Sequence, residues 1–216
     1  MITSRRPRTQ AERSAETQVA LLDATIESLV EIGYARTSTT EIVRRAGVSR
    51  GAQVHHYPTK GDLVVAAVEH VFARQEQGFV EAFRALPPAE QTLPRAIDLL
   101  WSIFAGPSYP ATLELVVAAR TDRDLAVVIQ ALATRFEQTV TGLFADLFPE
   151  LDGVPGAGRL VSFAFAVLQG AAISGYAGFG RPDDAVAMLR GLSRLASADL
   201  LPLLAMITDD DARPRR

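Results

Sequence analysis

The chain of 216 residues contains no cysteine, only three histidines and a single tryptophan. The absence of cysteine excludes disulfide bridges and thiolate metal sites. His55 and His56 are adjacent and point in different directions on a helix, where side chains four apart share a face, and His70 is distant in sequence. No nucleophile elbow is present, and the glycine-rich stretches at 153–158 and 175–180 do not follow a predicted strand. We therefore expect no metal, no cofactor and no enzymatic activity.

Charge is unevenly distributed along the chain. The chain has a net charge of −3, with 48% hydrophobic and 22% charged residues, which is typical of a globular protein with a substantial core. Residues 1–60 contain nine Lys/Arg and six Asp/Glu, a net +3, and the remainder contains thirteen and nineteen, a net −6. A basic N-terminal part on an acidic body indicates that one end binds a polyanion.

The basic N-terminus is not followed by an apolar segment of the kind found in signal peptides. Leu160 to Phe179 contains no charged residue and approaches the length of a membrane span. Three glycines and several polar side chains within it favour a helix packed in a protein core or interface. We expect a cytoplasmic protein that does not enter a membrane.

The pattern of apolar residues predicts helices throughout and no hairpin. We expect the first helix to begin near Gln10 and to end at Gly33, and a short helix to lie between a capping box at Ser38–Glu41 and Gly47. The further helices are expected at about 50–56, 60–86, 90–104, 109–121, 122–148, 159–178 and 182–207. We expect an all-α fold in which residues 1–62 form a three-helix N-terminal domain and residues 63–216 form a larger helical domain.

The two short helices and the turn through Ala46–Ser49 have the dimensions of a helix-turn-helix, whose second helix enters the major groove. Arg50 begins that helix and can donate two hydrogen bonds to guanine, and Gln53 can pair with adenine or reach a phosphate. The hydroxyl groups at the start of the first of these two short helices suit backbone phosphates, and so do two side chains that follow the second short helix. These residues are Ser38, Thr39, Thr40, Tyr57 and Lys60.

The run Thr39 to Gly51, followed by His55-His56-Tyr57-Pro58-Thr59-Lys60 and Leu63, resembles the signature of the TetR family of transcriptional regulators. The preceding Ile32-Gly33-Tyr34 with Thr37 is also similar. The detailed match covers about residues 15–65. The resemblance implies a homodimer, a C-terminal pocket for a small-molecule effector, and release of the operator when the effector binds.

The resemblance also implies base contacts near Thr40, Arg50 and Ala52, and phosphate contacts near Ser38, Thr39, His56, Tyr57 and Lys60. The sequence departs from the family pattern at Gln53 and Val54, where an apolar residue and a tyrosine are usual. That tyrosine touches the DNA backbone, a role that His55 or Gln53 could take here.

Candidate effector contacts are the aromatic residues of the C-terminal body and the predicted helix that carries Glu114 and Arg120. Ordinary core packing explains the aromatic residues one by one, and the two charged residues could equally lie on the surface. A largely apolar effector would be bound by some of Trp101, Phe104, Tyr109, Leu113, Glu114, Val117, Arg120, Phe136, Phe163 and Tyr176.

The small-residue stripe Ala164, Leu168, Ala171 and Gly175 suits close approach of helices across a two-fold axis, and packing within one chain explains it equally well. The expected function is a ligand-responsive repressor that binds a near-palindromic operator as a homodimer. The alternative is a helical ligand-binding protein without regulatory DNA binding.

Overall fold

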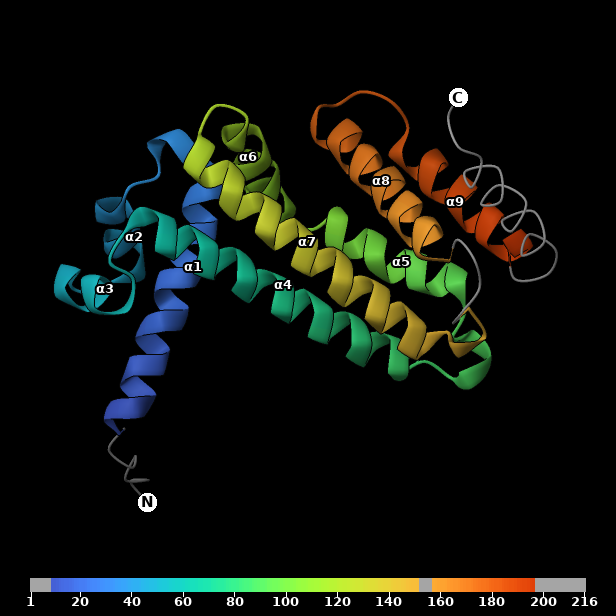
Figure 1. Ribbon diagram of the computed structural model, residues 1–216, viewed down its shortest axis with the longest axis horizontal. Coiled ribbons are helices and arrows are strands. Elements are labelled where there is room, and N and C mark those ends of the chain that lie inside the picture. The colour runs from blue at the N-terminus through green and yellow to red at the C-terminus, as the bar shows by residue number, and fades with distance from the viewer. Residues whose placement is uncertain (1–8, 152–156, 197–216) are drawn as a thin grey trace, which may run out of the picture. The chain divides into compact units, whose positions relative to one another are not determined.

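The computed structural model describes residues 9–151 and 157–196, and every regular element in these ranges is a helix (Figure 1). The order is α1 (Gln10–Arg36), α2 (Thr39–Ala46), α3 (Arg50–His56), α4 (Lys60–Arg84), α5 (Leu93–Phe104), α6 (Tyr109–Ala119), α7 (Arg123–Leu147), α8 (Ala157–Tyr176) and α9 (Pro182–Ala196). Two single 3-10 turns, at Pro88–Glu90 and Pro149–Leu151, follow α4 and α7. The all-α prediction is confirmed within the described ranges. Residues 197–207, predicted as the end of the last helix, lie outside them.

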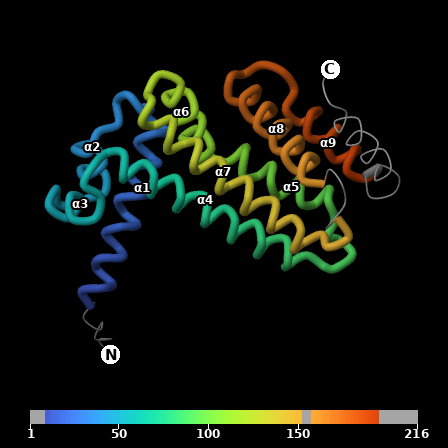
Figure 2. The backbone as a smooth tube through the Cα atoms, viewed as in Figure 1, coloured from blue at the N-terminus to red at the C-terminus, as the bar shows by residue number. Residues whose placement is uncertain are grey.

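The chain forms two compact units, each built from two separate stretches of sequence. Unit 1 comprises the described residues of 1–74 and 107–132, and unit 2 those of 75–106 and 133–216. The trace in Figure 2 shows α4 and α7 as uninterrupted helices, and each of them contributes to both units. The expected functional boundary between residues 62 and 63 stays a prediction, because packing units and functional domains need not coincide.

Unit 1 contains two hydrophobic clusters that lie on different faces of α1. Leu21 and Ala24 pack with Ile42 of α2 and Leu63 of α4. The second cluster joins α1 to α4, α6 and α7, and its buried members are Leu22, Ile26, Leu29, Val64, Ala67, Val68, Ala111, Leu115, Leu125 and Leu132. Helix α1 therefore connects the short helices α2 and α3 to the rest of unit 1.

The glycine expected to end α1 interrupts the helix without ending it. Gly33 has φ = 75° and ψ = 167°, a conformation open essentially only to glycine, and the helix resumes as far as Arg36. The backbone N–H and side-chain hydroxyl of Thr37 both donate to the Gly33 carbonyl, which closes this last turn. Tyr34 packs against the cluster that contains Leu29.

Unit 2 is held together by aromatic packing between α4, α5, α7 and α8. Phe83 is stacked on Phe79 and meets Phe148 edge to face, while Phe165 meets Phe104 and Phe136 edge to face. Edge-to-face pairs of this kind add about 0.5–1.5 kcal/mol to the burial of their apolar area. The Arg190 guanidinium on α9 lies 3.2 Å from the Asp98 carboxylate on α5.

Helix α8 is the most apolar long helix. By length and composition alone it could cross a membrane, the one helix of the described residues for which this holds, and a core or interface helix meets the same criterion. One face of α8 packs in unit 2 through Val161, Phe165, Leu168, Ala171 and Ala172. The exposed residues of this helix carry no charge beyond Arg159, and their exposure needs a different explanation.

Candidate nucleic-acid interface and apolar pocket

Two serines and one glycine define the turn between α2 and α3. Ser38 Oγ accepts from the Glu41 backbone N–H at 3.2 Å, and Ser49 Oγ accepts from the Ala52 backbone N–H at 3.1 Å. Gly47 has φ = 65° and the left-handed geometry of a helix C-cap. Each helix therefore begins at a polar cap, and the glycine permits the sharp change of direction between them.

The predicted capping box at Ser38 forms in one direction only. The Glu41 carboxylate accepts hydrogen bonds from Arg44 and from the Nε of Arg45, and these bonds lower the Glu41 pKa from its ordinary 4.5 to about 2. Arg45 also donates to Glu31 of α1 at 2.6 Å. Its side chain is 14% exposed, against 68% for Arg44. Arg45 is thus an internal link between α1 and α2, and Arg44 remains on the surface.

The exposed face of α3 consists of Arg50, Gly51, Val54 and His55. Ala52 and His56 are partly buried, and the His55 and His56 rings contact each other edge to face. Ser38 and Thr40, at the start of α2, are also exposed, while Thr39 is partly buried. The structure therefore leaves Arg50, the residue expected to read guanine, open to a DNA groove.

Gln53 does not take the DNA-contacting position predicted for it. Its side chain is only 1% exposed, and its amide nitrogen donates to the backbone carbonyl of Tyr57. A buried amide needs such a partner, because an unpaired polar group in the interior is costly. Gln53 therefore closes the C-terminal end of α3 from inside, and the predicted contact with adenine or phosphate is wrong for this structure.

Lys60 also has an internal partner instead of a free ammonium group. Its Nζ donates to the Tyr34 carbonyl at 2.7 Å and lies 3.7 Å from the centroid of the Tyr34 ring. Burial lowers the Lys60 pKa, and the carboxylate of Asp122 partly opposes this shift. Burial, with Asp122 beside the hydroxyl, raises the Tyr34 pKa. Lys60 therefore links α4 to α1, and the phosphate contact predicted for it stays a prediction.

Tyr57 lies three residues before Lys60 in sequence and is half-buried. It packs against both hydrophobic clusters of unit 1, and burial raises its pKa. The neighbouring Tyr57 and His56 rings are 6.3 Å apart. The phosphate contacts predicted for both residues stay predictions.

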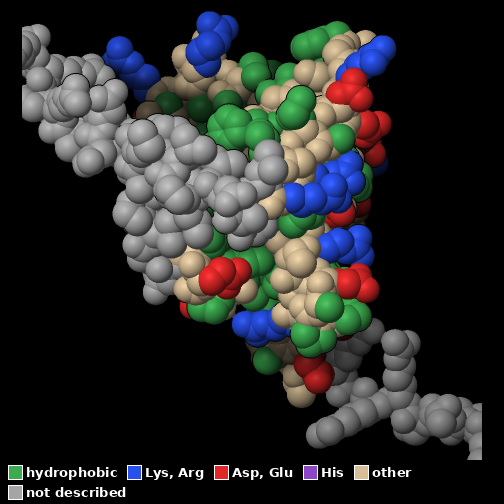
Figure 3. All heavy atoms as spheres, turned by 90° about the vertical axis from the view of Figure 1, so that its right-hand side faces the viewer, with side chains coloured by type: hydrophobic (Ala, Val, Ile, Leu, Met, Phe, Trp, Pro, Cys, Tyr) green, Lys and Arg blue, Asp and Glu red, His purple; other side chains and the backbone are tan. Residues whose placement is uncertain are grey.

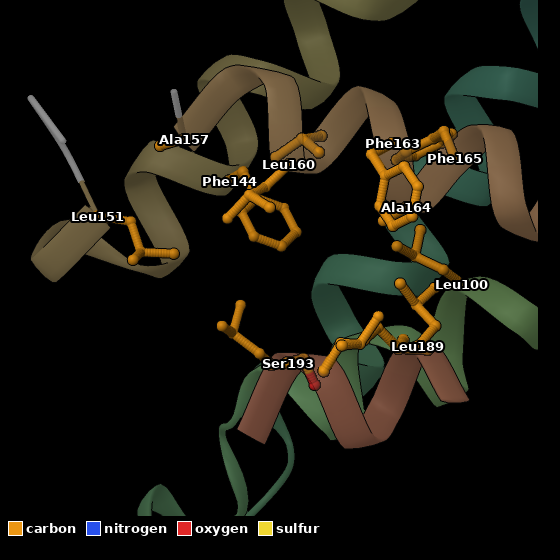
Figure 4. Close-up of a pocket in the computed structure, with 14 residues that line it drawn as sticks. Leu100, Phe144, Leu151, Ala157, Leu160, Phe163, Ala164, Phe165, Leu189 and Ser193 are labelled. Carbon is orange, nitrogen blue, oxygen red and sulfur yellow. The ribbon is translucent and has the colours of Figure 1, made fainter. Parts of the chain in front are cut away.

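Unit 2 contains an apolar pocket of about 240 Å³ between α5, α7, α8 and α9 (Figure 4). Phe144 and Leu160 border it from one side, and Leu189 and Ser193 of α9 from the other. Among the lining residues that the structure describes, Ser193 is the only one with a polar side chain. A pocket lined in this way suits a small apolar molecule.

Of the ten residues predicted to contact an effector, Phe163 alone lines this pocket. Phe104 and Phe136 pack on Phe165 of the pocket wall, and the Tyr176 hydroxyl donates to the carbonyls of Phe104 and Gly106. Trp101 is partly buried on α5. The rest belong to unit 1: Tyr109 is buried, Leu113 is partly buried, and Val117 and Arg120 are exposed.

Glu114 has a structural contact that the sequence did not predict. Its carboxylate accepts from the backbone N–H of Tyr34 at 3.1 Å, within unit 1. Glu114 does not line the pocket of unit 2, and the role of orienting an effector stays a prediction. The apolar residues that do line the pocket, such as Leu93, Leu160 and Leu189, carry no sequence signal that separates them from ordinary core.

Two of the four residues predicted for a dimer interface are inaccessible. Leu168 and Ala171 are buried within the chain, Ala164 lines the pocket, and only Gly175 is exposed. The stripe therefore packs inside unit 2, and the dimer role of Leu168 and Ala171 is wrong. The exposed apolar residues of α8 and α9 are others, namely Phe163, Ile173, Met188 and Leu192. Figure 3 shows hydrophobic side chains in green on this side of unit 2, with charged side chains gathered along one edge.

A capped helix that presents an arginine after a tight glycine turn defines a helix-turn-helix DNA-binding regulator. Residues 21–67 match the family model described as "Bacterial regulatory proteins, tetR family". An HTH-type transcriptional regulator of Mycobacterium bovis is 35% identical over 161 residues, which cover 74% of this chain and 79% of that relative. The chain belongs to the TetR family of transcriptional regulators. It is accordingly a DNA-binding regulator and not an enzyme.

Solved structures show the same fold. A transcriptional regulator from Rhodococcus sp. Rha1 aligns with a TM-score of 0.65 at 22% identity, over 84% of this chain and 97% of that chain. A regulator from Saccharomonospora viridis, solved in complex with choline, aligns with a TM-score of 0.63 at 16% identity, over 86% of this chain and 97% of that one. At these identities the similarity concerns the fold alone.

Proposed function

We propose that the protein is a cytoplasmic repressor that binds a near-palindromic operator as a homodimer and leaves it when a small apolar effector occupies the pocket of unit 2. Residues 1–62 act as the DNA-binding domain in this proposal, and residues 63–216 bind the effector and dimerise. The apolar pocket, in a chain that belongs to the TetR family, is the observation that supports regulation by an effector.

On the DNA side, Arg50 is the principal base contact, and Thr40 and Ala52 lie near base edges. Ser38, Thr39, His55, His56 and Tyr57 serve the phosphates, which position the protein and contribute most of the sequence-independent affinity. The exposure of Arg50, Thr40 and Ser38 supports this assignment.

The pocket favours an uncharged effector. No charged residue occurs among the described part of its lining, where Ser193 supplies one hydroxyl group. Burial of a charge without a partner is costly, so a cation such as the choline bound by the Saccharomonospora viridis regulator suits this pocket poorly. A compact hydrocarbon-like molecule with at most one polar group fits its lining best.

The exposed apolar residues of α8 and α9 support a homodimer. Phe163 and Ile173 on α8, and Met188 and Leu192 on α9, leave apolar area in contact with water unless a second protein surface covers it. A two-fold dimer would present two copies of α3, so the half-sites should be centred about one helical turn, or a multiple of it, apart.

The test measures DNA release by fluorescence anisotropy. The full chain is titrated onto DNA from upstream of its own gene, and a panel of small neutral hydrocarbons, phenols and esters is added to the complex. Ala164→Phe places a ring in the pocket and is expected to retain DNA binding and to lose the response to the active compound. Release of wild-type protein and Ala164→Phe at the same concentration would contradict this pocket.

The effector and the operator should weaken each other equally, because the coupling free energy between two binding sites is reciprocal. Calorimetry of the active compound with and without operator DNA measures the factor by which the operator lowers the affinity for the compound. Equal affinities in the two titrations would mean that the compound does not control DNA binding.

A further inference from the structure

The exposed face of α3 carries one aliphatic side chain, that of Val54. Val54 is 47% exposed, whereas the valines of the α2 region, Val43 and Val48, pack against the core of the helix-turn-helix. Arg50 and Val54 are four residues apart, so they lie on the same face of the helix. Any surface that meets Arg50 therefore meets Val54 as well.

The chemistry of the major groove offers few partners to such a side chain. An isopropyl group neither donates nor accepts a hydrogen bond, so it cannot read a donor–acceptor pattern or hold a phosphate. The C5 methyl group of thymine is the apolar feature by which base pairs differ in the major groove. Desolvation of Val54 against this methyl group is the one favourable base contact open to it.

The buried neighbour of Val54 fixes which way this side chain faces. Gln53 is held inside by its bond to the Tyr57 carbonyl, and Ser49 caps the first turn of α3. The helix therefore cannot rotate to bury Val54 without exposing an amide that is now paired. Four residues of α-helix rise about 6 Å, and base pairs are spaced by about 3.4 Å, so Arg50 and Val54 span about two base-pair steps.

We propose that Val54 is a specificity-determining residue that reads a thymine methyl group in each half-site, within about two base pairs of the guanine contacted by Arg50. The proposal rests on DNA binding through α3 and goes beyond it by naming the base and the atom. Loss of one buried methyl contact corresponds to about a fourfold loss of affinity per half-site, or ~0.8 kcal/mol at 1.4 kcal/mol per tenfold.

The experiment removes the methyl group from the DNA and the isopropyl group from the protein. The full-length protein first selects its operator from a random library. Each thymine is then replaced by deoxyuridine, which lacks only the C5 methyl group, and affinities are measured by anisotropy. Wild-type protein is expected to lose about fourfold at one thymine per half-site, and Val54→Ala is expected to bind the thymine and uracil operators equally.

Two further variants make the result specific. Val54→Thr retains one methyl group and should keep the uracil penalty, whereas Val30→Ala removes an exposed valine from α1 and should leave the penalty unchanged. A penalty that persists in Val54→Ala, or no penalty at any thymine, would overturn the proposal. A uniform loss on all sequences would also overturn it, by placing Val54 on the sugar-phosphate backbone. Failure to enrich any operator would overturn DNA binding itself.

Discussion

The carboxylate of Glu114 on α6 accepts a hydrogen bond from the backbone N–H of Tyr34, 80 residues earlier in the chain. A Cβ atom at the adjacent Gly33 would lie 2.7 Å from the same carboxylate oxygen. The end of α1 and helix α6 therefore meet at a point where both the backbone conformation and the space require glycine.

Gly33→Ala is expected to lower the free energy of unfolding by about 1–3 kcal/mol, because alanine rarely adopts this backbone conformation and its methyl group would displace Glu114. Gly47→Ala is the matched control, since Gly47 has a positive φ with no atom within 4 Å of the added Cβ. Urea unfolding of both variants measures the difference. A smaller loss for Gly33→Ala than for Gly47→Ala would contradict the close approach of Glu114.

Glu41 should make stability depend on pH in the acidic range. Its pKa is about 2 in the folded protein and 4.5 without its arginine partners. The folded state therefore gains stability from the ionised group above pH 4.5 and loses it as the pH falls toward 2. Glu41→Gln is expected to be less stable than wild type at pH 7, and this difference should shrink between pH 4.5 and 2.

Thermal unfolding across that pH range tests the prediction. Glu27→Gln, which removes an exposed glutamate from α1, is the control for loss of one surface charge. A constant difference between Glu41→Gln and wild type from pH 7 to pH 2 would show that Arg44 and Arg45 do not hold the ionised form of Glu41.

Lys60→Met should affect folding more than DNA binding. The substitution removes the hydrogen bond to the Tyr34 carbonyl and the contact of the ammonium with the Tyr34 ring, so a loss of about 1–2 kcal/mol in the free energy of unfolding is expected. The dependence of DNA affinity on salt should keep its slope. A decrease of that slope by about one unit would instead identify Lys60 as a phosphate contact.

Substitutions of Arg50 and Gln53 should have different effects in a DNA-binding assay, although the sequence predicts that both residues contact DNA. Arg50→Ala is expected to lose about 1–3 kcal/mol of discrimination at one operator position and to fold normally. Gln53→Leu should keep the base preference, because the Gln53 side chain is buried. Competition binding with single-base operator variants gives the answer, and a changed preference in Gln53→Leu would place that side chain in the groove.

The exposed apolar residues of α8 and α9 predict the effect of an added charge on assembly. Ile173→Glu and Met188→Glu are each expected to convert a dimer into a monomer at micromolar concentration, as measured by light scattering. Val127→Glu on α7 is the control, because Val127 is 68% exposed and Met188 67%. Dimers that survive both substitutions would exclude this face as the interface.

The sequence predicted most helices to within a few residues, because caps, glycines and prolines mark their ends. Ser38, Gly47 and Ser49 are local signals of this kind, and each forms a helix cap in the structure. The side-chain roles of Gln53, Lys60 and Glu114 depended instead on partners 4, 26 and 80 residues away. Polar side chains on a helix can face either water or the protein, and periodicity does not say which carbonyl or N–H group lies opposite.

The same limit applies to α8. A helix without charge beyond Arg159 predicts burial somewhere, but Leu168 and Ala171 proved to be buried in their own chain while Ile173 is exposed. The sequence also did not point to the pocket of unit 2, since its walls are leucines and phenylalanines that differ from core residues only by the space between them.

The interleaved construction of the two units limits how this regulator can be re-engineered. A chimaera that joined residues 1–62 to a foreign body would strip Leu22, Ile26 and Leu29 of the side chains that α4, α6 and α7 place against them. Exposure of three such residues would cost several kcal/mol, a large part of the stability of a small domain. A hybrid with new operator specificity is better made by exchanging the exposed residues of α3 than by exchanging the whole of residues 1–62.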